Sequence, residues 1–350
     1  MILWADRQDL RYCRAVLPRV SRTFALNIRL LRGTLGDAVR VGYLLCRTAD
    51  ALEDSWPGCA ADLRQRFEQL LSGLQGDAAA AQWLASQATE LAGGRADLEL
   101  VSHLPLVLRA FHGLPEGHRA TIAAGVQTLA RGMAAYAARA AGRAPDLPYL
   151  DTEAELDDYC WVVAGCVGVM LTGLYADQHG AGSPPTQLRR LEIAPVVGRA
   201  LQLTNILLDW PADVRRGRCY LPASWLAERG LRASDLVGRE NDAVQTVAER
   251  LEARARAALA RVPDYVELIP ERHQRFRLFC LWPALWALGS LEHARRDLEF
   301  PWGPRRPRLP RRELFGAAIG SLVPAHQTQA LSRLRAASGP AGAKSNPGSD

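Results

Sequence analysis

Three carboxylates crowd one face of a predicted helix near residue 50. Asp50, Glu53 and Asp54 are spaced i, i+3 and i+4, so on a helix their side chains lie over one another. Tyr43 and Arg47 extend this stripe upstream, and the apolar run 41–46 places the carboxylates at the end of a core helix. Taken alone, such a cluster is more often a solvated helix face. Like charges this close repel one another unless they share a cation. The cluster also lies at the end of a core helix, and together these two points favour a metal site.

A second polar stripe runs from Gln202 through Asn205 and Asp209 to Asp213. Its spacings of 3, 4 and 4 residues again place all four side chains on one helical face, and arginines follow at 215, 216 and 218. Mg²⁺ prefers oxygen ligands and is commonly bound by one or two carboxylates together with substrate phosphates, which arginine also binds. Two such stripes with arginine neighbours favour a magnesium–diphosphate site over two unrelated acidic faces.

The composition excludes several classes of protein. Of 350 residues, 48 % are hydrophobic and 23 % are charged, which is typical of a globular chain. The net charge is +6, and because Lys344 is the only lysine, nearly all of the positive side chains are arginines. This charge suits an anionic substrate or surface but is too small to argue for nucleic acid. The seven cysteines and seven histidines lack metal-ligand spacing, and no secretory signal opens the chain. We therefore expect a cytoplasmic protein with reduced thiols.

Alanine, leucine and arginine dominate and long valine–isoleucine alternations are missing, which predicts an all-α protein. The clearest helical segments are 40–55, 119–143, 153–176, 187–209, 241–262 and 275–298, with loops at 93–94, 144–148 and 180–185. No linker separates two cores, so we expect one domain over 1–336 and a disordered tail over 337–350. The uncharged run 159–176 is close to the minimum length of a membrane-spanning helix. Its acidic flanks favour a buried central helix, with close neighbours at Gly165, Gly168 and Gly173.

Prolines recur every third residue at 301, 304, 307 and 310, with arginines between and after them. This period suits polyproline II. A solvated linker is the simpler interpretation of the segment. An anion-binding loop that uses Arg305, Arg306 and Arg308 is the more specific one, because arginine suits phosphate oxygens.

Four blocks make the chain resemble the squalene/phytoene synthase family of head-to-head prenyl transferases, in its squalene-synthase-like form. They are SRTFA at 21–25, YLLCRTADALED at 43–54, YCWVVAGCVG at 159–168, and QLTNILLDWPAD at 202–213 with GRCYLP at 217–222. The blocks follow the family's order between about Tyr12 and Arg312. Four ordered blocks are far more specific than any single one.

The resemblance implies a single-domain, all-α isoprenoid-synthase-type bundle around a central cavity. It implies that five carboxylates hold Mg²⁺: Asp50, Glu53, Asp54, Asp209 and Asp213. It assigns catalytic roles to the four aspartates among them and to two tyrosines, Tyr43 and Tyr159. It assigns substrate contacts to Arg22, Arg47, Gln202, Asn205 and Arg218.

The implied reaction is head-to-head condensation of two farnesyl diphosphates through presqualene diphosphate to squalene, with Mg²⁺-dependent ionisation and then hydride transfer from NADPH. Phytoene-type relatives use a longer substrate, such as geranylgeranyl diphosphate, and lose a proton instead. Phytoene, dehydrosqualene or hydroxysqualene synthesis without reduction is therefore the alternative. GRCYLP favours the phytoene form, whereas FCLWP at 279–283 and AGCVG at 164–168 favour the squalene form.

The sequence also bears on the reductant and the membrane. Because no glycine-rich dinucleotide fingerprint is present, NADPH would meet side chains of the arginine-rich loop, namely Arg305, Arg306 and Arg308. Without a hydrophobic C-terminal anchor, any contact with a membrane is expected to be peripheral.

The chain departs from the family's pattern at three positions of the second stripe. Leu208 stands where the family usually has arginine, Ala212 stands where an acidic residue is common, and Pro211 lies inside the motif. Proline removes a helical hydrogen bond, so we expect a kink or helix end near Trp210, with Asp213 still facing Asp50. These departures keep a non-catalytic paralogue, acting as a binding subunit, as a second alternative. Retention of all five carboxylates argues against it, and the absence of DDxxD argues against a chain elongase or terpene cyclase.

Overall fold

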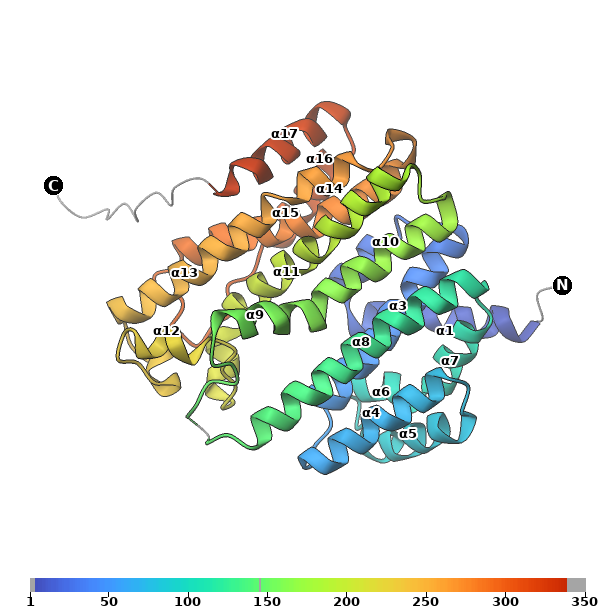
Figure 1. Ribbon diagram of the computed structural model, residues 1–350, viewed down its shortest axis with the longest axis horizontal. Coiled ribbons are helices and arrows are strands. Elements are labelled where there is room, and N and C mark those ends of the chain that lie inside the picture. The colour runs from blue at the N-terminus through green and yellow to red at the C-terminus, as the bar shows by residue number, and fades with distance from the viewer. Residues whose placement is uncertain (1–3, 145, 339–350) are drawn as a thin grey trace. The chain divides into compact units, whose positions relative to one another are not determined.

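A computed structural model describes residues 4–144 and 146–338 of the chain (Figure 1). Within these ranges the protein consists of helices and connecting segments without a β-strand, apart from one isolated bridge between Leu150 and Pro222. The prediction of an all-α protein is confirmed.

The helices cluster into two compact units, each built from two separate parts of the chain. Unit 1 comprises residues 1–142 and 162–195, and unit 2 comprises residues 143–161 and 196–350. The single catalytic domain over 1–336 stays a prediction. Of the predicted tail, residues 337 and 338 lie in the 3₁₀ turn Ala336–Ser338, and the remainder lies outside the described residues.

Unit 1 is organised around a long helix that carries the first acidic stripe. Its helices are α1 (Trp4–Val20), α2 (Arg22–Ile28), α3 (Gly33–Asp54), α4 (Ala60–Leu74), α5 (Ala78–Leu91), α6 (Ala96–Ser102), α7 (Leu104–His112), α8 (Glu116–Ala141) and α10 (Cys166–His179). Helix α3 packs against α1, α6, α7, α8 and α10. Leu44, Leu45 and Leu52 are fully buried in it, so apolar burial fixes the direction in which the polar stripe points.

Glycines bring neighbouring helices of unit 1 unusually close. A Cβ atom at Gly168 would overlap the carbonyl oxygen of Ala194 on the first part of α11 (Pro184–Arg215). A Cβ atom at Gly173 would lie 2.7 Å from Cγ2 of Thr121. The prediction that these two glycines admit close neighbours is confirmed.

The helix predicted over 153–176 is present but is interrupted at its centre. It consists of α9 (Glu153–Cys160), a π-helical segment (Trp161–Gly165) and α10. Each π turn inserts an extra residue, so the side chains on either side of it are rotated relative to a regular helix. Periodicity alone does not reveal such an insertion.

Two helical stretches, Glu153–His179 and Pro184–Arg215, are long and apolar enough to cross a membrane by length and composition. Core helices of soluble proteins pass the same test. Within unit 1, α10 packs on both α3 and α8, with Met170, Leu174 and Tyr175 buried. We therefore interpret the first stretch as a packed helix.

Unit 2 contains α9, the second part of α11, and the C-terminal helices. These are α12 (Ala223–Ala227), α13 (Asp242–Leu259), α14 (Val262–Glu267), α15 (Gln274–Arg296), α16 (Arg311–Gly320) and α17 (Pro324–Arg335). Helix α15 packs against α13, α14, α16 and α17, and it buries Leu281, Leu288 and Leu291.

Helix α11 continues past the proline of the second stripe. It runs from Pro184 to Arg215, so of the two expected outcomes a helix end near Trp210 is wrong. A kink at that point and the orientation of Asp213 toward Asp50 stay predictions. Leu207, Leu208 and Trp210 are each at most 3 % exposed, and the indole Nε1 of Trp210 donates to the carbonyl oxygen of Leu236 at 3.1 Å. Packing of the turn before Pro211 thus offsets the missing backbone hydrogen bond.

Candidate active site

In unit 1, the first two sequence blocks meet at Tyr43. Ser21 caps α2 by accepting a hydrogen bond from the backbone N–H of Phe24 at 3.3 Å, and the ring of Phe24 lies 5.3 Å from that of Tyr43. Burial raises the pKa of Tyr43 to about 12, although a hydrogen bond to Ser21 and the nearby Arg47 act in the opposite direction. Tyr43 is therefore a neutral phenol at physiological pH.

Arg47 is held by a carboxylate that sequence analysis did not identify. Its Nε and Nη2 atoms donate to the two carboxylate oxygens of Asp97 at 3.1 and 2.8 Å, whereas its Nη1 lies 3.5 Å from Asp50. Asp97 stands in the first turn of α6, 50 residues along the chain. Two parallel bonds fix both the position and the plane of the guanidinium group.

Burial also perturbs the ionisation of Asp50. Desolvation raises its pKa to about 6; Arg47 opposes this rise and Asp54 adds to it. Glu53 is half-buried and Asp54 is exposed. Asp50 resists ionisation and lies beside two other acids. A cation bound there would therefore stabilise the ionised carboxylates.

The raised pKa predicts that Asp50→Asn stabilises the metal-free protein. A folded-state pKa above the unfolded value of about 3.8 means that ionised Asp50 opposes folding, and this cost grows as pH rises from about 4 through about 6. Because 38 % of the side chain is exposed, solvent screening limits the gain to about 1 kcal/mol at pH 7.5. Urea unfolding in EDTA at pH 7.5 and pH 4 measures it, with Glu90→Gln on α5 as the exposed control. Equal stabilities of Asp50→Asn and wild type at pH 7.5 would refute the prediction.

Arg47 is a predicted substrate contact, and its pairing with Asp97 leads us to expect that Asp97→Asn lowers kcat/KM about 10- to 100-fold, because misplacing a substrate-orienting group by about 1 Å has this order of effect. Asp97→Glu should recover part of the loss. In an Arg47→Ala background, Asp97→Asn should have little further effect, since Asp97 acts through Arg47. An equal loss in both backgrounds would show that Asp97 has a different role.

In unit 2, the third and fourth blocks meet through stacked aromatic rings. The rings of Tyr159 and Tyr220 lie 5.0 Å apart and nearly parallel, and Tyr149 meets Tyr220 edge-on at 5.3 Å. The backbone N–H groups of Tyr149 and Ala223 bond to the carbonyl oxygens of Cys219 and Leu150, each at 2.8 Å. These bonds attach the segment 217–222 to the start of unit 2 and hold Tyr220 against Tyr159.

An ion-pair network also positions α9. Glu153 and Asp157 both bind the guanidinium group of Arg254 on α13, at 2.7 Å for Asp157, and Arg199 on α11 lies 3.3 Å from Asp157. Tyr159 follows two residues later and is buried. Sequence analysis missed this network because its members are not spaced along one helix.

The second stripe carries an ion pair to the proline-rich segment. The Nε atom of Arg306 lies 3.0 Å from a carboxylate oxygen of Asp209. Arg305 and Arg308 are exposed. Of the three arginines predicted to meet NADPH, Arg306 is thus engaged with a predicted metal ligand.

The remaining predicted residues differ in burial. Gln202, Asp213 and Arg218 are half-buried, whereas Asn205 and Arg22 are exposed. The peptide N–H of Arg218 bonds to the carbonyl oxygen of Asp213 at 2.8 Å, where α11 ends. The structure therefore brings Tyr43, Arg47 and Asp50 together in unit 1, and Asp209 and Arg306 together in unit 2.

The donors of both stripes fit a hard divalent cation. All predicted ligands are carboxylate oxygens, which Mg²⁺ prefers. Among the described residues, no group of three or more histidine, cysteine, aspartate or glutamate side chains is placed to hold an ion by itself.

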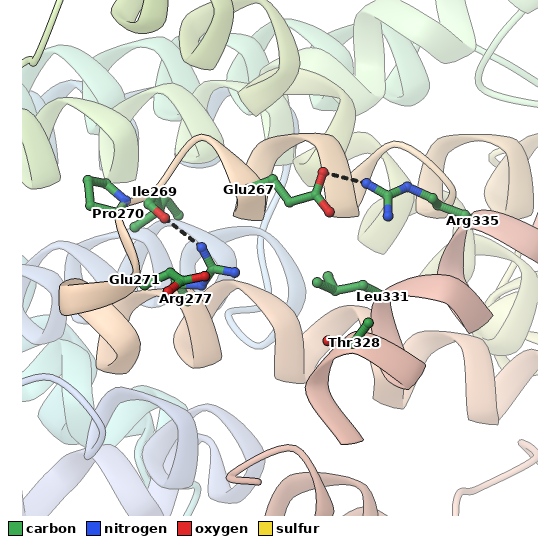
Figure 2. A pocket seen from close by; sticks show the side chains of 8 residues that line it. All are labelled: Glu267, Ile269, Pro270, Glu271, Arg277, Thr328, Leu331 and Arg335. Atoms are coloured by element: carbon green, nitrogen blue, oxygen red, sulfur yellow. Dashed lines mark hydrogen bonds and ion pairs between the residues drawn. The ribbon is translucent and has the colours of Figure 1, made fainter. Parts of the chain in front are cut away.

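A pocket of about 350 Å³ in unit 2 contains none of the predicted site residues (Figure 2). It lies among α14, α15 and α17. Arg277 on its wall is 7 % exposed and donates to the carbonyl oxygen of Ile269 at 2.7 Å, while Glu267 and Arg335 form an ion pair. These contacts tie the turn after α14 to α15, and α14 to α17, which is a structural role.

Comparison with known proteins identifies first the fold and then the family. A solved structure of TcSQS in complex with a ligand superimposes with a TM-score of 0.73 at 22 % identity, covering 97 % of this chain and 94 % of that one. The fold is that of the all-α isoprenoid synthases. The squalene/phytoene synthase family profile matches residues 17–313, and the chain belongs to this family.

Curated relatives come from both branches of the family. Squalene synthase of Homo sapiens is 27 % identical over 287 residues, which are 81 % of this chain and 63 % of the relative. The 15-cis-phytoene synthase of Synechocystis sp. is 31 % identical over 237 residues, 66 % of this chain and 60 % of the relative. The chain thus spans somewhat less than two thirds of the length of these relatives.

Proposed function

We propose that this protein condenses two molecules of farnesyl diphosphate head to head, through presqualene diphosphate, to squalene. The observation that carries the proposal is that each acidic stripe has an arginine beside it in its own unit. Arg47 is oriented next to Asp50, and Arg306 lies on Asp209. Carboxylates that can hold Mg²⁺ next to guanidinium groups that can bind phosphate form the donor set that a prenyl diphosphate requires.

In this proposal, the carboxylates that would hold Mg²⁺ are Asp50, Glu53 and Asp54 in unit 1 and Asp209 and Asp213 in unit 2. When bound, it would neutralise the charge that develops on the leaving diphosphate. Arg47, kept in plane by Asp97, would bind phosphate oxygens and orient the leaving group. The Tyr43 phenol keeps its proton because burial raises its pKa, so its hydroxyl can donate a hydrogen bond to a diphosphate oxygen.

Aromatic rings would support the cationic stages of the reaction. Tyr159 is buried and stacked on Tyr220, which fixes the direction of its face. The negative face of such a ring attracts a carbocation, as it attracts other cations. Tyr220 and the α9 ion-pair network act as positioning groups for Tyr159.

NADPH is the proposed hydride donor of the last step, and the exposed Arg305 and Arg308 are its proposed phosphate contacts. Arginine forks suit phosphate oxygens. Arg306 belongs to the same segment but is paired with Asp209, so we place it nearer the diphosphate than the reductant.

Phytoene-type synthesis without reduction is the second candidate. It is favoured by the GRCYLP segment, which is anchored beside Tyr159, and by the similarity to the Synechocystis phytoene synthase. Lipid analysis after incubation of the purified protein with Mg²⁺ and either farnesyl or geranylgeranyl diphosphate distinguishes the two. Squalene formed from farnesyl diphosphate when NADPH is added supports the first proposal, whereas a C40 product formed only from geranylgeranyl diphosphate supports the second.

A further inference from the structure

Helix α16 and the turn that follows it expose a continuous apolar face. Phe315 and Ile319 are 46 % and 64 % exposed and stand one turn apart on the helix, and Leu322 and Val323 after it are 51 % and 48 % exposed. Single exposed apolar side chains are ordinary on a protein surface. Four of them within nine residues form a patch, which indicates an interaction site.

The opposite side of α16 is firmly attached to α15, so the exposed face is not the result of a loosely packed segment. The indole Nε1 of Trp286 donates to the carbonyl oxygen of Leu314 at 3.1 Å, and that of Trp282 donates to Oγ of Ser321 at 2.8 Å. Ala318, between these two anchors, is 2 % exposed. The helix therefore presents Phe315 and Ile319 outward in a fixed orientation.

Within the described part of unit 2, this face is left uncovered. A Cβ atom built on Gly316 or Gly320, which lie next to the two apolar side chains, would meet no atom within 4 Å. The surface of unit 2 is thus open beside both Phe315 and Ile319.

Positive charge stands at one end of the face. Arg311 and Arg312 precede Phe315 by one helical turn and are exposed. Neither forms an ion pair within 4.0 Å inside the described ranges. Glu313, the one acidic residue of α16, instead binds His293 on α15 at 2.8 Å. The outer face is accordingly apolar along its length and basic at its start.

We propose that the outer face of α16 docks on an anionic phospholipid surface. Phe315 and Ile319 would enter the boundary between headgroups and acyl chains, and Arg311 and Arg312 would bind lipid phosphates. Apolar side chains with adjacent arginines and no free acid are the pattern of helices that lie in a membrane interface. Four side chains cover far less than the roughly 800 Å² per partner that a stable protein interface needs, which disfavours a second copy of the chain.

The test is binding of the full chain to vesicles of phosphatidylcholine with 30 % phosphatidylserine, against pure phosphatidylcholine, measured by co-sedimentation. We expect preferential binding to the anionic vesicles. The double variant Arg311→Gln, Arg312→Gln should lower the partition coefficient by about 25-fold at low salt, since each arginine near such a surface contributes about fivefold. Phe315→Ser with Ile319→Ser should lower it by at least about tenfold.

Matched controls separate this face from general surface properties. Leu188→Ser, which removes a side chain 66 % exposed on α11, and the exposed pair Arg229→Gln, Arg239→Gln should bind vesicles as wild type does. Turnover of detergent-dispersed substrate should be unchanged in the α16 variants, because no proposed site residue is altered.

A second measurement locates the face directly. In a Cys59→Ser background, which removes the exposed cysteine, an environment-sensitive fluorophore on Ile319→Cys should shift to the blue on adding anionic vesicles, and one on Leu298→Cys should not. The proposal would be overturned if the wild-type protein did not bind anionic vesicles. It would also be overturned if the α16 variants bound them as the wild type does. Concentration-dependent dimerisation lost in Phe315→Ser, Ile319→Ser without vesicle binding would assign the face to a second copy instead.

Discussion

Replacing Asp54 or Asp209 by alanine is expected to lower turnover about 10³-fold while the protein stays folded, because each change removes electrostatic help to a leaving diphosphate. Asp54 is exposed and Asp209 is half-buried, so neither change opens a cavity in a core. Circular dichroism and thermal unfolding should therefore match wild type. The rate is measured as product formation at saturating substrate over a range of Mg²⁺ concentrations.

Two exposed carboxylates provide matched controls for this experiment. Glu90 lies on α5 and Glu192 lies on α11, the helix that also carries Asp209, and both are exposed. Glu90→Ala and Glu192→Ala should turn over as wild type does. Near-normal activity of Asp54→Ala or Asp209→Ala at saturating Mg²⁺ would remove that residue from the proposed metal site.

The reductant is expected to decide which product leaves the enzyme. With farnesyl diphosphate and Mg²⁺ alone, presqualene diphosphate or a hydroxylated or dehydro product should accumulate, and NADPH should redirect nearly all of the flux to squalene. The reason is that a late carbocation in the absence of hydride can only lose a proton or capture water. Chromatography with mass spectrometry of the extracted lipids measures the ratio.

The loop assignment is tested separately from the reductive step. Arg305→Ala with Arg308→Ala should raise the apparent KM for NADPH without changing the first half-reaction, whereas Arg306→Ala should affect the first half-reaction because Arg306 contacts Asp209. Arg229→Ala is the control at an exposed arginine of unit 2. If the product composition is the same with and without NADPH, a phytoene-like or water-quenching enzyme is favoured. An unchanged KM for NADPH in the double variant would refute only the loop assignment.

Local patterns were sufficient to predict the helices that carry the candidate site. The spacing of Tyr43, Arg47, Asp50 and Asp54 places them along α3, and that of Gln202 to Asp213 places them along α11. Such stripes are readable because a helix repeats every 3.6 residues. The glycines at 168 and 173 were likewise readable as points of close approach, since they interrupt an apolar run.

Contacts between distant segments were not predictable in the same way. Asp97 meets Arg47 across 50 residues, and Arg306 meets Asp209 from a segment without regular periodicity. No local spacing marks such partners. The π segment at 161–165 was missed because it changes the register of a helix without changing its composition. At Pro211 a local rule predicted a kink or a helix end, and the helix continues through a well-packed segment around Trp210 instead of ending there.

The measurement that tests the central claim most directly is release of inorganic pyrophosphate from farnesyl diphosphate by the purified protein with Mg²⁺ and without NADPH, together with mass spectrometry of the lipid. The account predicts pyrophosphate release that EDTA abolishes, coupled to a C30 presqualene diphosphate or its hydrolysis-derived products. Wild-type protein that is folded, yet releases no pyrophosphate above the EDTA control from either farnesyl or geranylgeranyl diphosphate, would contradict it.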